Sequence, residues 1–257
     1  PRQTCFSRKA SGFSAEEQVI AANVNAVIVV TDSGPDYSLR RMERYFTLIS
    51  RSGAKAVVLV NKADLYPDKQ NQEAAEAIRA LNADADVHVT SVKKRKGLKV
   101  LKDYLKRGQS VAVIGSSGVG KSALVNLLLG EDWQWVDEVN EITGKGRHTT
   151  TAARLLHLAD GRLLLDTPGT RSLALWESWE GLADTFPEVE TAAEDCQFAD
   201  CFHENEPGCA VIAAVADGTI PADRLDSWRH LREEMEQLDG HLVDQQRKAE
   251  RTGRPPR

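Results

Sequence analysis

The chain has 257 residues, an apolar content of 41% and a formal net charge of -5 at pH 7. Such a chain is long and apolar enough to form a globular, soluble α/β domain with a smaller partner domain, and its negative charge argues against a uniformly basic nucleic-acid binder. Because no stretch approaches the roughly 18 to 20 apolar residues of a membrane span, and no signal-peptide pattern begins the chain, we expect a cytoplasmic protein that does not bind membranes.

Apolar, β-branched runs and segments of helical spacing alternate along the first half of the chain. The runs cover residues 24–30, 56–60 and 110–114, and the helical segments cover roughly residues 38–51, 72–81 and 98–106. Apolar runs of this length are typical of strands buried on both faces of a sheet. The alternation therefore predicts a mostly parallel sheet with helices on both faces.

A polar stretch follows the apolar residues 123–130 and runs to Thr151, where we expect a mobile loop. Two further apolar runs, at residues 153–159 and 162–166, flank the dipeptide Asp160-Gly161. This dipeptide is a strong hairpin signal. The two runs are therefore predicted to be antiparallel neighbours in the sheet.

Beyond about Trp179 the strand-like runs disappear, and helical spacing returns at residues 221–238. This change predicts a small second domain. The last residues, 247–257, lack apolar periodicity and are expected to be disordered in isolation. Basic residues gather in that tail and in one earlier run, and each group is consistent with a solvated surface or with RNA contacts: Lys93, Lys94, Arg95, Lys96 and Lys99; Arg247, Lys248, Arg251, Arg254 and Arg257.

Residues 115–122, GSSGVGKS, match the full pattern of a phosphate-binding loop and lie between an apolar strand and a helix start, the context that the motif requires. The glycines allow backbone N–H groups to point at phosphates beside a helix N-terminus whose dipole favours anions. Lys121 would neutralise β- and γ-phosphate charge, and the Ser122 hydroxyl would bind Mg²⁺. The expected nucleotide contacts are Gly115, Ser116, Ser117, Gly118, Val119, Gly120, Lys121, Ser122 and Ala123.

The motif DTPG, at residues 166–169, ends an apolar run. The Asp166 carboxylate can reach the magnesium shell from there, and the N–H of Gly169 can approach the γ-phosphate. The same four residues could form an ordinary turn built by Asp, Pro and Gly. The phosphate-binding loop upstream favours the functional interpretation.

The motif NKAD, at residues 61–64, follows an apolar run and indicates guanine as the base. The Asp64 carboxylate can accept both the ring N–H and the exocyclic amine of guanine, a donor pair that adenine lacks. The stem of Lys62 could lie along the purine face. We expect Asn61, the first residue of the motif, at the nucleotide as well. Ser91 and Val92 are expected to offer backbone groups to the purine, because TSVKKRKGL at residues 90–98 suits a second base-contacting turn. A plain strand-to-helix turn is the alternative for NKAD.

Three of the four cysteines lie close to a histidine in CQFADCFHENEPGC. In a cytosolic chain such a cluster marks a metal site more often than a disulfide framework. Three thiolates and an imidazole suit a tetrahedral Zn²⁺ ion, and four protein ligands predict a structural site. The expected ligands are Cys196, Cys201, His203 and Cys209; buried, inert cysteines are the alternative.

The guanine-reading motif precedes the phosphate-binding loop, so the nucleotide-binding fold is predicted to be circularly permuted. The order NKAD, TSV, GSSGVGKS, GRHTTT, DTPG and Cys/His cluster resembles the RsgA (YjeQ) family of circularly permuted, ribosome-associated GTPases over nearly the whole chain. The resemblance implies an α/β, circularly permuted P-loop GTPase domain at residues 23–178 and a small helical zinc-binding domain at residues 179–257. The family's N-terminal OB-fold is expected to be absent, with residues 1–22 as a connecting segment.

The resemblance also implies GTP hydrolysis in late maturation of the small (30S) ribosomal subunit, stimulated by the subunit and coupled to release. The implied partners are GTP or GDP with Mg²⁺, the subunit and its 16S rRNA, and the implied state is a monomer. No Gln follows DTPG, and the family match implicates His148 of GRHTTT in hydrolysis and Thr150, rather than Thr149 or Thr151, in binding Mg²⁺. A surface histidine is the other interpretation of His148. Other functions left open are a GTP-gated RNA- or protein-binding module with incidental hydrolysis and a GTP-dependent metal chaperone.

Overall fold

The computed structural model describes residues 4–9, 17–130, 154–158, 161–166 and 179–252. The chain divides into two compact units. The first unit contains residues 1–6, 19–39 and 52–173, and the second contains residues 7–18, 40–51 and 174–257. The second unit is therefore discontinuous in the sequence, and the domain boundaries expected after residues 22 and 178 stay predictions.

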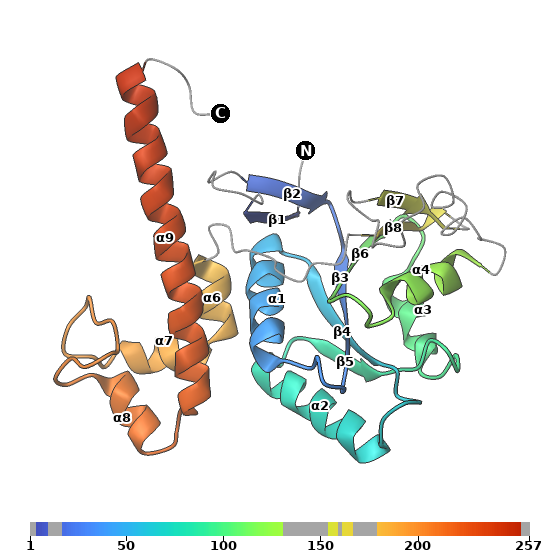
Figure 1. The fold of residues 1–257 in the computed structure, drawn as a ribbon, viewed down its shortest axis with the longest axis horizontal. Coiled ribbons are helices and arrows are strands. Elements are labelled where there is room, and N and C mark those ends of the chain that lie inside the picture. Colours follow the sequence, from blue (N-terminus) through green and yellow to red (C-terminus); the bar gives the residue numbers. More distant parts are fainter. Residues whose placement is uncertain (1–3, 10–16, 131–153, 159–160, 167–178, 253–257) are drawn as a thin grey trace. The chain divides into compact units, whose positions relative to one another are not determined.

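Figure 1 shows the elements of the described residues. The strands are β1 (Cys5–Lys9), β2 (Glu17–Ala22), β3 (Ala26–Asp32), β4 (Lys55–Asn61), β5 (Asp86–Val89), β6 (Ser110–Ile114), β7 (Arg154–His157) and β8 (Leu163–Asp166). The helices are α1 (Leu39–Ser52), α2 (Asp68–Leu81), the 3-10 turn η1 (Leu98–Val100), α3 (Leu101–Tyr104), α4 (Lys121–Leu129), α6 (Trp179–Thr185), α7 (Pro187–Ala193), α8 (Ala210–Ala216) and α9 (Ala222–Thr252). None of these described helices has the length and apolar character to cross a membrane.

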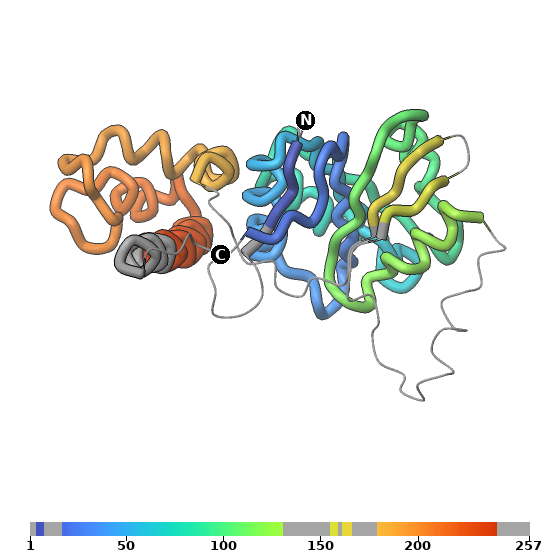
Figure 2. Tube along the Cα trace, turned by 90° about the horizontal axis from the view of Figure 1, so that it is seen from above, coloured from blue at the N-terminus to red at the C-terminus, as the bar shows by residue number. Residues whose placement is uncertain are grey.

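Most strands join one sheet in the order β5-β4-β3-β6-β8-β7, and β1 and β2 form a separate pair. The strands β3, β4, β5, β6 and β8 run parallel to one another, whereas β7 is antiparallel to β8. Figure 2 shows this last pair in yellow at one edge of the sheet. The structure confirms both the mostly parallel sheet and the antiparallel pair predicted from the sequence.

The core of the first unit lies between the sheet and helices α3 and α4. Side chains alternate between the two faces of a strand, so every second residue of β3 and β6 points to this core. Ile28 and Val113 are fully buried there in one cluster with Leu101 of α3 and Leu124 of α4. Helix α2 packs against β4 and β5, and its buried Ile78 lies outside that cluster, which places α2 on the other face.

Several elements differ from the sequence-based prediction. Strand β5 and the β1–β2 pair are missed by it, because they are short and interrupted by polar residues such as His88. Helix α2 begins at Asp68 rather than at residue 72, directly after Pro67, whose φ of -57° already suits a helix. Helix α9 continues past Leu238 to Thr252, so the first residues of the expected disordered tail are helical.

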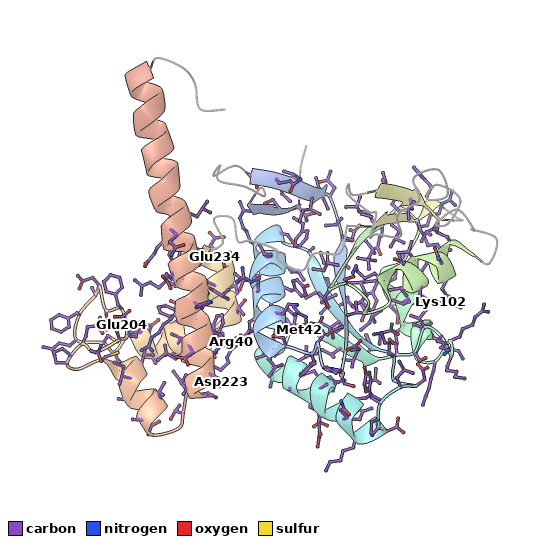
Figure 3. All side chains as sticks on the ribbon, viewed as in Figure 1. Arg40, Met42, Lys102, Glu204, Asp223 and Glu234 are labelled. Atoms are coloured by element: carbon purple, nitrogen blue, oxygen red, sulfur yellow. The ribbon has the colours of Figure 1, made fainter. Side chains whose placement is uncertain are left out.

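In the second unit, α1 packs against helices from the C-terminal part of the chain. Arg44 of α1 pairs with Glu234 of α9, the residue labelled in Figure 3, with 2.6 Å between Nη1 and Oε2. A Cβ atom added to Gly181 of α6 would lie 2.1 Å from the carbonyl oxygen of Thr47. Only glycine therefore permits the close approach of α6 to α1.

A buried ion pair joins these helices. Arg224 of α9 lies 2.8 Å from Glu43 of α1, and the two side chains are only 11% and 3% exposed. The same guanidinium contacts a carboxylate oxygen of Glu188 at 2.6 Å and the carbonyl oxygen of Thr185 at 2.7 Å. It also lies over the ring of Phe186, 4.2 Å from the centroid. Arg224 thus connects α1, α6, α7 and α9 through polar contacts.

Candidate nucleotide site and candidate metal centre

The phosphate-binding loop connects β6 to α4 at the carboxyl end of the parallel strands. Gly115 and Gly120 have φ angles of 142° and 102°, in the region that favours glycine. A Cβ atom on Gly115 would also lie 2.2 Å from the carbonyl oxygen of Val30 in β3. The buried ammonium group of Lys121 donates to the carbonyl oxygens of Gly115 and Ser116 at 2.8 Å and 2.6 Å. The loop therefore curls around the lysine at the start of α4.

Asn61 joins the guanine-reading motif to the two neighbouring turns. Its side chain is buried, and its Nδ2 donates to the carbonyl oxygen of Val119 in the phosphate-binding loop at 2.9 Å. Its Oδ1 accepts from the N–H of Val92 at 3.0 Å. A Cβ atom on Gly120 would lie 2.4 Å from Asn61 Nδ2, so the glycine makes room for this bridge. One amide thus holds together the motif, the loop and the turn that the sequence singles out separately.

Asp64 lies at the exposed edge of this site. The hydroxyl of Ser91 donates to Asp64 Oδ1 at 2.5 Å and accepts from the N–H of Lys94 at 3.0 Å. This hydrogen bond, with the charges of Lys93 and Lys94, outweighs desolvation and lowers the pKa of Asp64. The carboxylate is therefore ionised at neutral pH, in the form that accepts two hydrogen bonds from a base.

The turn that contains Ser91 presents the predicted basic run to solvent. Ser91 and Lys96 exchange two backbone hydrogen bonds, at 3.0 Å and 2.9 Å, which close the turn. Gly97 follows with a φ of 75°, and a Cβ atom there would lie 2.5 Å from the carbonyl oxygen of Val89. The exposed basic residues are Lys93, Lys94, Arg95, Lys96 and Lys99. This exposure is consistent with both interpretations of the run, a solvated surface and an RNA contact.

Two polar residues of the site are missed by the sequence-based prediction. Asp32, at the end of β3, lies 2.6 Å from the ammonium group of Lys62. Asn71 of α2 is fully buried, accepts from the hydroxyl of Ser33 at 2.8 Å and donates to the carbonyl oxygen of Ala63 at 3.3 Å. Asp32 could have been found from its place at the carboxyl edge of a parallel sheet, where α/β folds bind ligands. Asn71 carries no such signal.

Other predicted site residues are placed by their elements. Ser122 and Ala123 form the exposed first turn of α4. Asp166 ends β8, and its backbone pairs with Val113, two residues before the phosphate-binding loop begins. The side chain of Asp166 is not among those that the structure describes. Three predicted residues lie wholly outside the described part of the chain: His148, Thr150 and Gly169.

The four expected metal ligands lie together between α7 and α8. Their ligand atoms are all within 4.8 Å of one another: Cys196, Cys201, His203 and Cys209. The Cys196 and Cys209 sulfurs are 3.9 Å apart, and His203 Nδ1 lies 3.6 Å and 3.4 Å from them. Tetrahedral zinc, with bonds of about 2.3 Å to sulfur and about 2.0 Å to nitrogen, implies ligand separations of about 3.8 Å and 3.5 Å. The separations among Cys196, His203 and Cys209 therefore match those of a tetrahedral metal ion, and Cys201 lies beside them as the fourth candidate ligand.

The surroundings of the cluster favour the protonation states in which two of its members bind a metal, the thiolate of Cys196 and the neutral imidazole of His203. Burial opposes ionisation of Cys196, but hydrogen bonds from the N–H groups of Val211 and Ala210 outweigh it and lower the pKa of the thiol. Burial, followed by the charge of Arg232, lowers the pKa of His203 and keeps the imidazole neutral, as metal binding requires. Glu204, labelled in Figure 3, belongs to the same loop.

Two family models match the chain. The model of the RsgA GTPase matches residues 1–176, and the model of the 50S ribosome-binding GTPase matches residues 110–251. The chain is 46% identical over 235 residues to the small ribosomal subunit biogenesis GTPase RsgA of Methanosarcina acetivorans. The alignment covers 91% of this chain and 63% of that protein, so the chain spans less than two thirds of its relative.

Two solved structures share the fold. The crystal structure of YjeQ from Thermotoga maritima gives a TM-score of 0.60 at 26% identity, covering 94% of this chain and 76% of that one. The structure of YloQ, described as a circularly permuted GTPase, gives a TM-score of 0.57 at 28% identity, covering 84% and 70% of the two chains. The circularly permuted fold predicted from the order of the motifs is thereby confirmed.

Proposed function

Because this chain belongs to the RsgA GTPase family, we propose that it hydrolyses GTP in the biogenesis of the small ribosomal subunit. The observation that carries the proposal is the Asn61 bridge, whose two hydrogen bonds join the guanine-reading motif to the phosphate-binding loop. A base and a phosphate chain can therefore be held in one site. The relative from Methanosarcina acetivorans is named for small-subunit biogenesis, and the proposal extends that role to this chain.

GTP would be held by its base at β4 and by its phosphates at the start of α4. The ionised Asp64 would accept the two guanine donors, with Ser91 and Val92 beside the base. Backbone N–H groups of residues 115–123 would bind the phosphates, since a glycine-rich turn at a helix N-terminus favours anions. Lys121 would neutralise charge on the β- and γ-phosphates.

Magnesium is the cofactor that this phosphate-binding loop implies. The exposed hydroxyl of Ser122 would be one ligand and Thr150 a second, with Asp166 reaching the shell of the ion. When bound, the ion offsets negative charge on the phosphates. Because Thr170 and Arg171 follow DTPG where many GTPases carry Gln, we assign the orientation of the attacking water to His148, with Gly169 near the γ-phosphate.

The proposed partner is the small ribosomal subunit with its 16S rRNA, in the cytoplasm, and the chain would act as a monomer. A missing Gln predicts slow turnover by the chain alone, so we expect the subunit to stimulate hydrolysis, with release of the chain afterwards. GTP turnover measured with isolated small subunits, isolated large subunits and neither tests this. Stimulation by large subunits alone would contradict the assignment and favour the partner that the second family model names.

The role of His148 has its own test. His148→Ala should retain GTP binding and lose most of the stimulated hydrolysis. His230→Ala, which changes an exposed histidine of α9, serves as the matched control and should keep both. An unchanged single-turnover rate of His148→Ala with small subunits would remove His148 from the mechanism.

The second candidate function is a GTP-gated RNA- or protein-binding module with incidental hydrolysis. It is favoured by the exposed basic run beside the base site and by the missing Gln. This candidate predicts subunit binding that depends on the nucleotide but turnover that no subunit stimulates. The same turnover assay, with a sedimentation measurement of binding, therefore separates the two functions.

We also propose that the metal held by the Cys/His cluster is zinc and that its role is structural. Three sulfurs and one imidazole at the observed separations fill a tetrahedral shell and leave no position for a reacting molecule. When bound, zinc would stabilise the loop between α7 and α8 by tying its ends together. One zinc per chain in the purified protein supports the assignment. Absence of zinc, with folding unaffected by a chelator, would contradict it.

A further inference from the structure

A buried carboxylate holds the lysine of the guanine-reading motif. The side chain of Asp32 is 6% exposed, and its Oδ2 lies 2.6 Å from Nζ of Lys62, whose side chain is 28% exposed. The other carboxylate oxygen accepts from the N–H of Gly34 at 3.1 Å, which fixes the direction of the carboxylate. An ammonium group paired with a buried, oriented carboxylate has much less freedom than a surface lysine.

The backbone of Lys62 is also held by its surroundings. Lys62 has a φ of 60°, an uncommon conformation for a residue other than glycine. Its carbonyl oxygen accepts from the N–H of Leu65 at 2.8 Å, and the preceding residue is the buried Asn61. With both ends of Lys62 held, the four-carbon stem between them has a defined course beside the base site.

We propose that Asp32 is a positioning residue of the guanine site. By holding the Lys62 ammonium group, it orders the stem against which the purine face packs before the nucleotide binds. Ordering a flexible side chain in advance removes an entropic cost from binding. The inference rests on the proposed function, since it requires that this site binds guanine nucleotides.

The chemistry of the contact separates affinity from base selectivity. The lysine stem contacts the face of the purine, which guanine and hypoxanthine share, whereas Asp64 accepts from the 2-amino group that hypoxanthine lacks. Loss of Asp32 should therefore lower the affinities for GDP and for IDP by the same factor. Asp64→Asn should instead change the ratio of the two affinities.

The experiment is a double-mutant cycle on GDP affinity, measured with fluorescent GDP. Lys62→Met removes the ammonium group and keeps an apolar stem. Asp32→Ala should weaken GDP binding by about tenfold in the parent chain, within the range found for directly contacting residues. In the Lys62→Met background the same change should have almost no effect. A residue that only supports the fold would give equal losses in both backgrounds.

Two further variants serve as controls. Asp32→Asn keeps the acceptor for Gly34 and removes the charge, so it should fold and give a smaller loss than Asp32→Ala. Asp86→Ala breaks the ion pair between Asp86 and Lys55, 3.3 Å apart at the opposite end of β4, and should leave GDP affinity unchanged.

An equal loss of GDP affinity in the parent chain and in Lys62→Met would overturn the inference while leaving the proposed function intact. Unchanged GDP affinity in both Asp32 variants would do the same. If Asp32→Ala does not fold, Asp32→Asn takes its place in the cycle with the same criteria. A parent chain that binds neither GDP nor GTP would instead refute the proposed function, and the inference with it.

Discussion

Removal of Arg224 should destabilise the second unit strongly. Its partner Glu43 is 3% exposed, and the Oε2 atom of Glu43 has no hydrogen-bond partner among the described residues. Arg224→Met would leave that carboxylate buried without its cation, which costs about 3–5 kcal/mol in proteins. Glu188 is 32% exposed and can be solvated, so its loss of a partner adds little. We expect the free energy of unfolding of the unit to fall by about 4 kcal/mol.

Urea unfolding followed by hydrogen exchange on peptides of α9 would measure this loss in the second unit itself. Adding Glu43→Met should recover most of it, because apolar replacements of a buried ion pair are often neutral. Glu236→Met, which breaks the more exposed pair with Arg232 on the same helix, is the control and should cost less than about 1 kcal/mol. A loss below about 1 kcal/mol for Arg224→Met, or no recovery in the double variant, would refute the reasoning.

Three further outcomes are expected. Gly120→Ala should weaken GDP binding by more than about tenfold in calorimetry, because the left-handed backbone costs about 1–2 kcal/mol and the new Cβ would lie 2.4 Å from Asn61 Nδ2; retained affinity would contradict the close approach. Ser91→Ala should raise the pKa of Asp64, because the hydrogen bond from Ser91 stabilises the carboxylate, so that Asp64 protonates at higher pH in the variant than in the parent. A carbon-13 NMR titration measures this; an unchanged midpoint would show that Ser91 does not lower the pKa of Asp64. Cys209→Ser should lower the zinc content, whereas Cys5→Ser, outside the cluster, should not; equal zinc in both variants would remove Cys209 from the ligand set.

Most of the main sheet and the motifs it carries could be predicted because their signals are local. Residues 24–30, 56–60 and 110–114 are predominantly apolar runs, and each overlaps a buried parallel strand. The hairpin signal at Asp160-Gly161 likewise lies between the strands that it joins. The antiparallel pairing of β7 with β8 follows from it.

The contacts that hold the candidate site together could not be predicted, because they join residues far apart in the sequence. The hydrogen bond between Ser33 and Asn71 spans 38 positions, and the bridge from Asn61 to Val119 spans 58. No local pattern shows which buried amide meets which hydroxyl. The ion pair of Asp32 with Lys62 is of the same kind, since it depends on two adjacent parallel strands ending in register.

The discontinuity of the second unit limits how this chain can be cut or recombined. Glu43 lies far before the phosphate-binding loop in the sequence, yet it is the buried partner of Arg224 in α9. A fragment that begins at residue 179 would carry the metal ligands but leave α1 behind, so Arg224 would lose Glu43 and Gly181 would lose its close contact with Thr47. Recombination between two related genes at any point between α1 and α6 would likewise join α1 of one protein to the C-terminal helices of another. The two segments should therefore be inherited together.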